Sequence, residues 1–462
     1  MNQLWTRQYP PGVPQEIDVD AYASIVELVE RSCDQYRSRT AYECMGVQLS
    51  YDELDRSTQD FASYLQNVLG LDKGDRVALM MPNVLQYPVA LFGVLRAGMV
   101  AVNVNPPYTP RALAHQLKDS GARVIVIMEN FCQALEQVLK KTRVECVITT
   151  QLADLAPFPK SLLVNAAVKY VRKLVPKWHI PGTVPLRAAL ARGKAQPYMH
   201  AQLAHADIAF LQYTGGTAGL PKAATLTHGN IVANLEQMSA WMQPFMKGDG
   251  EIIVTALPLY QIFTLVLNCL LFLKIGAKNV LITDPRDLPG FVAELKKHRF
   301  TAFSGVNTLF DALLDTPGFD SVDFSDLHLA VGGGVQQAVA ERWQKATGKA
   351  LIEGYGPTEC LPAVTCTPLT QPDWSGTIGV PLPSTIVSLR DDDDNEVPQG
   401  QPGELCVKGP QVMQGYWRKP EENAKVFTAD GFLKTGDIAI MDERGYLRLV
   451  DRKELRGQQV WA

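Results

Sequence analysis

Hydrophobic residues early in the chain form short continuous runs that alternate with helical patterns. The runs at 77–81, 99–104 and 124–128 have the length of buried strands. Between them, 87–97 and 111–117 carry apolar residues at helical spacing. Further short apolar runs lie at 252–257, 280–282 and 302–304. Buried strands that alternate with helices predict a mostly parallel sheet covered on both faces, an α/β fold.

The pattern changes after about residue 375. Turns rich in glycine, proline and acidic residues separate short strand patterns such as 386–390 and 404–408. The acidic run 391–394 is typical of a solvated turn. We therefore expect a small antiparallel unit after the α/β body.

The segment 213–222, with the sequence YTGGTAGLPK, carries the strongest chemical signal. An apolar strand pattern precedes it at 208–213, and a helical pattern begins at Asn230. Glycines let a backbone approach a ligand closely, and successive N–H groups in such a loop bind an anion. Threonine hydroxyls and one lysine would complete a phosphate cradle. The spacing differs from both GxxxxGK[ST] and GxGxxG, and the alternative is a plain surface loop.

Four more clusters contain residues suited to a nucleotide. Three glycines, 332–334, follow an apolar run and would let a flat ring press on the backbone, although a tight turn explains them equally well. The sequence GYGPTE at 354–359 offers an aromatic face, a hydroxyl and a carboxylate. A glutamate beside phosphate is a natural Mg²⁺ ligand. The sequence TGD at 435–437 places an acid after a turn, where acids often accept ribose hydroxyls, and DRK follows at 451–453.

Composition excludes several classes of function. The net charge of −4 and the lack of a basic stripe with aromatics argue against nucleic acid as a partner. The eight cysteines include no CxxC pair, which favours reduced thiols and argues against a zinc site. The first twenty residues do not resemble a secretory signal. The longest apolar run, 262–273, is shorter than the roughly 20 residues of a bilayer span, so we expect a buried helix or pocket wall.

The segment 162–178 has a basic amphipathic pattern. At helical spacing, three cations share one face and apolar residues share the other. The cations are Lys169, Arg172 and Lys173, and Lys177 would extend their face. The apolar residues are Leu163, Ala167, Tyr170, Val171, Leu174 and Val175. The pattern favours a surface helix docked on the core, and the alternative is a helix that lies on an anionic bilayer.

Together these motifs resemble the adenylate-forming superfamily, which contains acyl-CoA synthetases, luciferases and peptide-synthetase adenylation domains. Segments 213–222, 355–359, 435–437 and 451–453 are similar to its phosphate loop and to its YGxTE, TGD and DRK motifs. The stretches that resemble bacterial long-chain fatty acid–CoA ligases are 74–83, 103–106, 257–260 and 409–413. The likeness covers residues 1 to about 453.

The resemblance implies that ATP and a fatty acid give an acyl-adenylate and pyrophosphate, after which coenzyme A takes the acyl group. It implies Thr214 and Glu359 as Mg²⁺ ligands, and these two with Lys222 as catalytic residues. The implied nucleotide-binding residues are Tyr213, Thr214, Gly215, Gly216, Thr217, Ala218, Gly219, Lys222, Gly332, Gly333, Gly334, Tyr355, Gly356, Thr358, Asp437 and Arg452. The implied substrate contacts are Tyr260, Gln261 and Gly354, and the run 262–273 would line part of an acyl tunnel.

The chain departs from the family pattern at several positions. Ala218 replaces a usual threonine, Ala223 a usual glycine, and Gln261 a usual histidine near the expected carboxylate end of the acyl pocket. Family members continue into a small mobile domain that supplies a lysine for adenylation and a face for coenzyme A. The likeness stops near Lys453, so we expect this domain to be absent and the activity to be much weakened. A non-catalytic protein that binds nucleotide or fatty acid, and a ligase for other carboxylic acids, stay open as alternatives.

The resemblance implies a division of the chain into four parts. We predict an N-terminal α/β subdomain at 1–205, a second α/β subdomain with the nucleotide site at 206–375, a small β-rich subdomain at 376–450, and a hinge remnant with an atypical tail at 451–462. The expected partners are a long-chain fatty acid, ATP and coenzyme A, with Mg²⁺. A homodimer is left open. The expected location is the cytoplasm, or the inner face of the membrane if 162–178 binds lipid.

Overall fold

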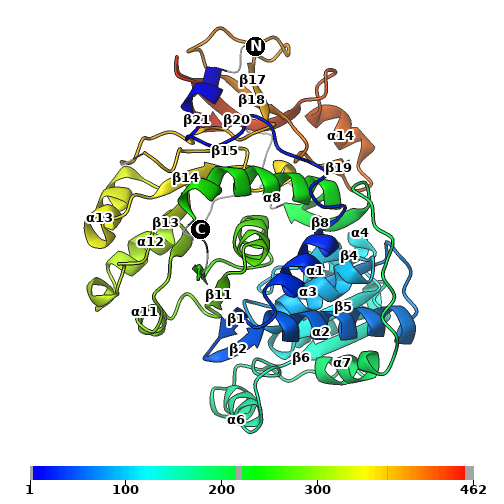
Figure 1. The fold of residues 1–462 in the computed structure, drawn as a ribbon. Helices are drawn as coiled ribbons and strands as arrows, with labels where there is room; N and C mark the ends of the chain where they lie inside the picture. The colour runs from blue at the N-terminus through cyan, green and yellow to red at the C-terminus, as the bar shows by residue number, and fades with distance from the viewer. Residues whose placement is uncertain (1–3, 215–220, 247, 249, 372, 453–462) are drawn as a thin grey trace.

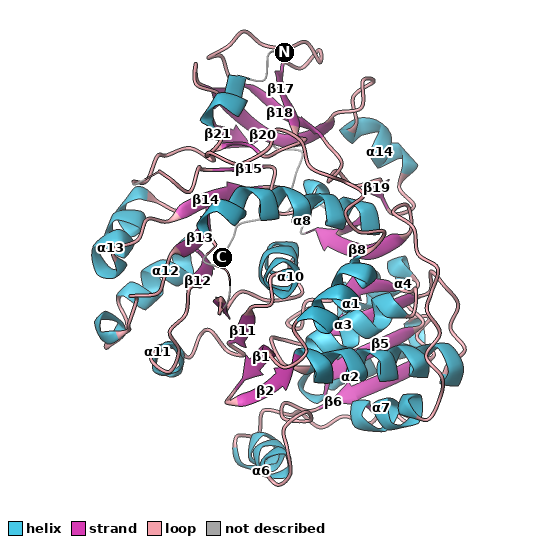
Figure 2. Ribbon diagram, viewed as in Figure 1, coloured by secondary structure: helices cyan, strands magenta, loops and turns pink. Residues whose placement is uncertain are grey.

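The computed structural model describes residues 4–214, 221–246, 248, 250–371 and 373–452. Within them the strands form two large sheets and one small one (Figures 1 and 2). The sequence-based prediction of an α/β body with a small antiparallel unit is therefore confirmed.

The first large sheet has eight strands and a parallel centre. Its order is β19 (Gly415–Tyr416), β9 (Lys222–Thr227), β8 (Ile208–Thr214), β4 (Val100–Asn103), β3 (Arg76–Met80), β5 (Val124–Met128), β6 (Cys146–Thr150) and β7 (Val184–Pro185). Only the pairs of β9 with β8 and with β19 are antiparallel among its described strands.

Helices cover both faces of this sheet. Consecutive strand residues point to opposite sides, and here the residues on both sides are apolar and buried. Val77 packs in the main core with α1 (Ile25–Gln35), α2 (Tyr51–Ser63) and α3 (Gln86–Arg96). Ala78 packs on the other face with α4 (Pro110–Ser120) and α5 (Cys132–Glu136). Helix α7 (Leu186–Lys194) lies close against α2.

The second large sheet has nine strands. Its order is β16 (Val380–Pro381), β15 (Thr365–Cys366), β14 (Ile352–Tyr355), β13 (Leu329–Gly333), β12 (Ala302–Val306), β10 (Ile252–Thr255), β11 (Lys278–Leu281), β1 (Thr40–Cys44) and β2 (Val47–Ser50). One face is covered by α11 (Leu288–Leu295), α12 (Asn307–Leu314) and α13 (Gln337–Thr347), and Trp343 of α13 packs against Phe303 of β12 and Phe310 of α12. The opposite face joins the main core, which contains α8 (His228–Met242).

The two large sheets do not follow the boundary that the sequence predicts at residue 205. Strands β1 and β2 come from the first predicted subdomain but belong to the nine-stranded sheet. Strands β8 and β9 follow residue 205 but belong to the eight-stranded sheet. The physical reason is long-range pairing, since Tyr42 of β1 lies opposite Asn279 of β11. The exact division into subdomains stays a prediction.

The small sheet is antiparallel and consists of β17 (Ile386–Arg390), β18 (Gly403–Lys408), β20 (Leu433–Met441) and β21 (Leu447–Arg452). Helix α14 (Pro420–Val426) connects the edge strand β19 of the eight-stranded sheet to it. Figure 1 shows the small sheet beside the carboxyl-terminal end of β14. Asp437 and Arg452 lie opposite each other on β20 and β21.

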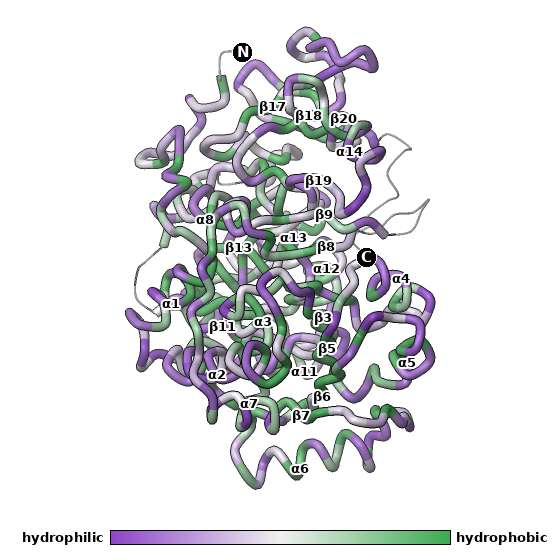
Figure 3. The backbone as a smooth tube through the Cα atoms, turned by 90° about the vertical axis from the view of Figure 1, so that its right-hand side faces the viewer, coloured by the Kyte–Doolittle hydropathy of each residue, from purple (hydrophilic) through white to green (hydrophobic). Residues whose placement is uncertain are grey.

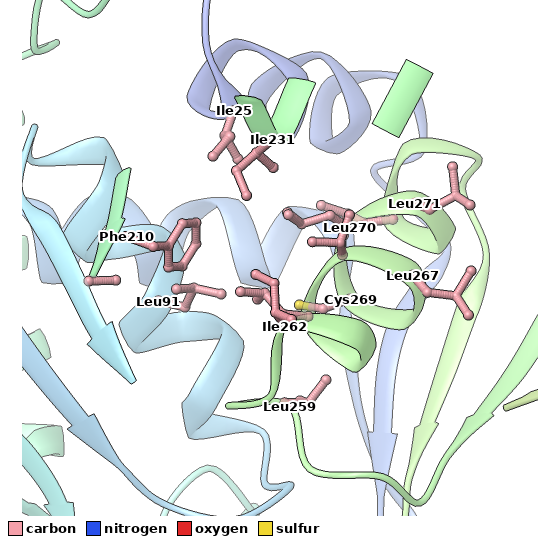
Figure 4. Close-up of a cluster of buried hydrophobic side chains, with 14 of the residues drawn as sticks. Ile25, Leu91, Phe210, Ile231, Leu259, Ile262, Leu267, Cys269, Leu270 and Leu271 are labelled. Atoms are coloured by element: carbon pink, nitrogen blue, oxygen red, sulfur yellow. The ribbon is translucent and has the colours of Figure 1, made fainter. Parts of the chain in front are cut away.

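The apolar run 262–273 forms a buried helix, as one of the two sequence expectations proposed. It consists of α9 (Ile262–Thr264), a π-helical stretch η7 (Leu265–Leu271) and α10 (Phe272–Lys274). Figure 4 shows Ile262, Cys269 and Leu270 facing Leu91 and Phe210, which come from the eight-stranded sheet layer. The helix therefore joins the two large sheets through one continuous core.

The segment 162–178 does not form the docked amphipathic helix that the sequence favoured. The helix consists of α6 (Lys160–Ala166) and a π-helical turn η5 (Ala167–Val171), and Lys173 has a left-handed φ of 51°. Only Ser161 and Val168 are buried on it, because those two face the body of the protein. The expected apolar face instead points to solvent, and Figure 3 shows α6 standing apart from the body.

Candidate active site

The predicted phosphate loop connects two antiparallel strands. Residues 215–220, which include Gly215, Gly216, Thr217, Ala218 and Gly219, lie outside the described residues. Thr214 ends β8 and Lys222 begins β9, and the two residues lie opposite each other. The Thr214 hydroxyl is buried and donates to the Lys222 carbonyl oxygen at 3.3 Å. Both ends of the loop are thereby fixed by the sheet.

Tyr213, also predicted to touch nucleotide, directs its hydroxyl to α4. That hydroxyl donates to Asp119 Oδ2 at 2.7 Å and to the Gln116 carbonyl oxygen at 3.3 Å. Burial and the nearby Asp119 carboxylate raise the pKa of Tyr213 well above its ordinary value. The Tyr213 hydroxyl therefore anchors β8 to α4.

The short segment 413–417 brings Lys222 and Glu359 to one place. Its backbone pairs with β9, where Tyr416 lies opposite Ala224. At its start, the Met413 N–H donates to the Glu359 carbonyl oxygen at 2.8 Å. This pairing is a consequence of tertiary structure, because the strands lie far apart in sequence.

Tyr416 is the side chain that joins the two predicted catalytic residues. Its hydroxyl donates to Glu359 Oε1, and both residues are buried. Its ring lies under the Lys222 ammonium group, with Nζ 4.5 Å from the ring centroid, which is a cation–π contact. The sequence analysis did not select Tyr416. Its position after a glycine in a turn-rich region was the only local signal.

Lys222 also has a charged partner that the sequence analysis did not select. Its Nζ lies 2.9 Å from Glu422 Oε2 on α14. The hydrogen bond from Lys222, followed by one from Lys425, lowers the pKa of Glu422 to about 2. Glu422 is therefore ionised throughout the neutral pH range.

The three glycines at the end of β13 lie beside β14. Gly332 is opposite Glu353. A Cβ on Gly333 would lie 4.0 Å from the Gly354 carbonyl oxygen, and one on Gly334 would meet no atom within 4 Å. Gly334 has a left-handed φ of 63°, which favours glycine. The carboxyl ends of these two parallel strands therefore leave backbone at Gly333 and Gly334 at least partly accessible at one edge.

Glu353 holds the turn that follows the three glycines, and it was not selected from the sequence. Its Oε1 accepts a hydrogen bond from the Val335 N–H at 2.8 Å, which ties β14 to the turn after the glycines. Burial raises the pKa of Glu353 to about 7. No local pattern indicates this role, because a glutamate in a short strand pattern is usually exposed.

A chain of polar contacts leads from β14 to the small sheet. The Tyr355 hydroxyl donates to Asp437 Oδ2 at 2.5 Å, and Arg452 Nε lies 3.2 Å from Asp437 Oδ1. Burial, followed by the Asp437 carboxylate, raises the pKa of Tyr355 well above its ordinary value. The structure thus joins three residues that the sequence analysis placed around adenine and ribose.

The turn between Tyr355 and Glu359 is tightly packed. A Cβ on Gly356 would lie 2.4 Å from the Leu361 carbonyl oxygen, so only glycine fits there. Thr358 and Glu359 form the 3₁₀ turn η9 (Thr358–Cys360), and both are buried. Backbone packing therefore fixes the turn that carries Glu359, and the Tyr416 hydroxyl bonds its carboxylate.

The predicted substrate contacts Tyr260 and Gln261 lie on a loop held by Asn83. The Asn83 side chain donates to the carbonyl oxygen of Leu257 at 2.9 Å and accepts from the Leu259 N–H at 2.8 Å. Gln212 Nε2 donates to the Tyr260 carbonyl oxygen at 3.0 Å, which links the loop to β8. Gln261 is the N-cap residue of α9.

Comparisons with known proteins show the family of the chain. The family model of AMP-binding enzymes matches residues 29–417. The chain belongs to the family of AMP-binding enzymes. It is 55% identical over 456 residues to a long-chain-fatty-acid–CoA ligase of Escherichia coli O6:H1, with 98% of this chain and 81% of that protein covered. It is 50% identical over 458 residues to one of Haemophilus influenzae, with the same shares covered.

Solved structures of this family have the same fold. A long-chain-fatty-acid-CoA ligase from Archaeoglobus fulgidus superposes with a TM-score of 0.80 at 23% identity, over 96% of this chain and 87% of that one. The anthranilate CoA ligase AuaEII, solved with anthranoyl-AMP, superposes with a TM-score of 0.81 at 21% identity, over 94% of this chain and 80% of that one. At these identities the likeness shows the fold alone.

Proposed function

We propose that this chain activates long-chain fatty acids with ATP and then passes the acyl group to coenzyme A. The observation that carries the proposal is the convergence of Lys222 and Glu359 on Tyr416 in a chain 55% identical to a long-chain-fatty-acid–CoA ligase. Binding proteins without turnover, and ligases for aryl or short acids, are the competing possibilities.

In the first step a fatty carboxylate oxygen would attack the α-phosphorus of ATP, and pyrophosphate would leave. Two anions must meet, so positioning and charge neutralisation are the main needs. Lys222 would neutralise phosphate charge, and Thr358 would donate to the α-phosphate. The exposed backbone at Gly333 and Gly334 with the Tyr355 ring would hold adenine, while Asp437, supported by Arg452, would accept the ribose hydroxyls.

The residues fit a magnesium ion. Mg²⁺ prefers one or two carboxylates together with phosphate oxygens, hydroxyls and water. Glu359 offers a buried carboxylate whose orientation is fixed by the Tyr416 hydroxyl, and Thr214 offers a buried hydroxyl at the end of β8. We propose these two as its ligands. When bound, the ion would neutralise phosphate charge.

In the second step the coenzyme A thiolate would attack the acyl carbonyl carbon, and AMP would leave. The Asn83-supported loop would place Tyr260 and Gln261 at the carboxylate end of the acyl chain. Burial raises the pKa of Tyr260 to about 12, so its hydroxyl stays protonated and can donate to that carboxylate. Each buried CH₂ adds about 0.8 kcal/mol, so an apolar pocket alone favours long chains.

Pyrophosphate release with a series of acids from acetate to oleate tests the proposal. Release that depends on the acid and peaks at long chains is expected, and Glu359→Ala should abolish it. Glu421→Ala is the matched control, because Glu421 is an exposed glutamate near the same site. A peak at short or aryl acids would mean that the chain is a ligase for those acids. ATP binding without pyrophosphate release would favour a binding protein without turnover.

We further infer that residues 158–177 contact an anionic membrane surface. Six large apolar side chains between 158 and 174 are more than half exposed, namely Phe158, Leu162, Leu163, Tyr170, Val171 and Leu174. The same segment holds five cations and no acid, although the chain as a whole is acidic. Apolar side chains with flanking cations suit the interface of an anionic bilayer. Among the described residues, no helix is both long and apolar enough to cross a bilayer.

Flotation with vesicles tests the membrane contact. Binding is expected with vesicles that contain an anionic lipid and is expected to be weaker with neutral ones. Both Leu163→Ser with Val171→Ser and Arg172→Glu with Lys173→Glu should reduce it. Lys345→Glu, at an exposed position on α13, is the matched charge control. Equal flotation of all variants would overturn the contact, and binding would then have to be sought elsewhere on the chain.

A further inference from the structure

The phosphate-binding lysine of the proposed site is already engaged by an anion of the same chain. Lys222 Nζ lies 2.9 Å from Glu422 Oε2, and the two side chains are 33% and 35% exposed. This exposure leaves the pair accessible to solvent and to a diffusing ligand. An ion pair of this kind contributes little stability, so it can exchange partners readily.

The geometry around the pair favours a held lysine over a freely moving one. The Tyr416 ring lies 4.5 Å below Nζ and limits its movement on one side. The other oxygen of Glu422 pairs with Lys425 at 3.0 Å, which fixes the carboxylate on α14. Glu422 therefore presents a fixed anion to Lys222 from a helix outside the loop and the glycine edge.

We propose that Glu422 is an internal competitor of the ATP phosphates for Lys222, an inference that rests on the proposed function. Before ATP binds, the Glu422 carboxylate is paired with the Lys222 ammonium group. On binding, a phosphate with greater charge takes its place, and Glu422 keeps Lys425 as its partner. Glu422 thus sets the affinity for ATP without touching the reacting atoms, and we regard it as a positioning residue.

This exchange has two consequences that a purely structural role would not have. The loss of the Glu422 charge should strengthen ATP binding, whereas the loss of a structural contact would weaken it. The effect should also depend on Lys222 and should decrease at high ionic strength, because salt screens exposed charges. It should be constant across the neutral range, since the pKa of Glu422 is lowered to about 2 by its lysine partners.

Titration of the full chain with MgATP tests the inference. Glu422→Gln keeps the size of the side chain and removes its charge, and we expect the Kd for MgATP to fall by about two- to fivefold at low salt. Glu421→Gln, the neighbouring exposed glutamate, controls for the general loss of a negative charge and should change the Kd less. In a Lys222→Gln background, Glu422→Gln should have no effect beyond that of Glu421→Gln.

Three results would overturn the inference. These are an unchanged or weakened affinity in Glu422→Gln, an equal gain in Glu421→Gln, and a gain that persists without Lys222. The proposed function fails in different ways: either neither the wild-type chain nor Glu422→Gln takes up MgATP, or both bind it without release of pyrophosphate. Thermal unfolding of each variant confirms that the compared chains are folded.

Discussion

The hydroxyl of Tyr416 donates a hydrogen bond to the buried carboxylate of Glu359. Tyr416→Phe removes the donor and keeps the ring. Loss of a hydrogen-bond donor to a buried carboxylate lowers the free energy of unfolding by about 1–3 kcal/mol. The variant should therefore unfold at a lower temperature. MgATP should restore more stability to it than to the wild type, since the cation would satisfy the same carboxylate. Thermal unfolding with and without MgATP measures both effects.

The control for this variant is Tyr446→Phe, at a half-buried position in the turn between β20 and β21. It should show neither the lower unfolding temperature nor the larger ligand-induced shift. A MgATP shift in Tyr416→Phe equal to that of the wild type would mean that Glu359 is not a ligand of the ion.

Asn83 should control the affinity for fatty acid through the loop that carries Tyr260 and Gln261. Its amide donates to the Leu257 carbonyl oxygen, and its oxygen accepts from the Leu259 N–H. Asn83→Asp places a charge against carbonyl oxygens, which should lower the free energy of unfolding by about 1–3 kcal/mol. Steady-state kinetics should show a rise in KM for the fatty acid with a smaller change in KM for ATP. The reverse pattern would contradict the role of this loop.

Glu353 should make stability depend on pH. Burial raises its pKa from 4.5 to about 7. Since the folded pKa lies above the unfolded one, the folded state binds more protons between these values, and stability falls as the pH rises from about 4.5 to about 7. Glu353→Gln keeps an acceptor for the Val335 N–H and should remove this fall. We expect a gain of about 3 kcal/mol near pH 8 and a much smaller one near pH 5, measured by denaturant unfolding.

The comparison across pH makes the Glu353 prediction specific. A variant that is more stable by the same amount at both pH values would show that the effect does not come from ionisation. A variant that is less stable at both would show that the amide cannot replace the carboxylate as an acceptor.

Gly193 should be required for the close packing of α7 on α2. A Cβ at this position would lie 1.8 Å from the Asp60 carbonyl oxygen, so the helices must separate to accept it. Gly193→Ala should lower the free energy of unfolding by about 1–3 kcal/mol, the usual cost of overpacking. Lys194→Ala, at the next and exposed position, should be close to neutral. Equal unfolding curves for Gly193→Ala and the wild type would contradict the observed packing.

Local sequence patterns were sufficient for the elements that are buried and regular. The run 124–128 matches β5 and the run 386–390 matches β17. Continuous or alternating apolar residues of this length can bury their side chains in few conformations other than a strand. Tyr355 and Asp437 were both selected from their motifs, and the structure joins them by a hydrogen bond, while their role in binding nucleotide stays a prediction.

Patterns failed where a residue's environment depends on distant chain segments. Strand β9 was not predicted, because its small residues lie in a strand that is held by pairing with β8 and β19. Tyr416 and Glu422 carry no periodic signal and come to Lys222 only through that pairing. Segment 162–178 was misjudged for a similar reason, since amphipathicity does not say which face meets the protein.

The placement of β1 also constrains how the chain can be made. It can pair with the adjacent β2 at once, but its parallel partner β11 begins at Lys278, so the ladder on its other side must wait for a much later segment of the nascent chain. During that time its hydrophobic edge is exposed to other chains and to chaperones. Synthesis from the ribosome should therefore produce the nine-stranded sheet late, and a pause upstream of Lys278 should favour aggregation over productive folding.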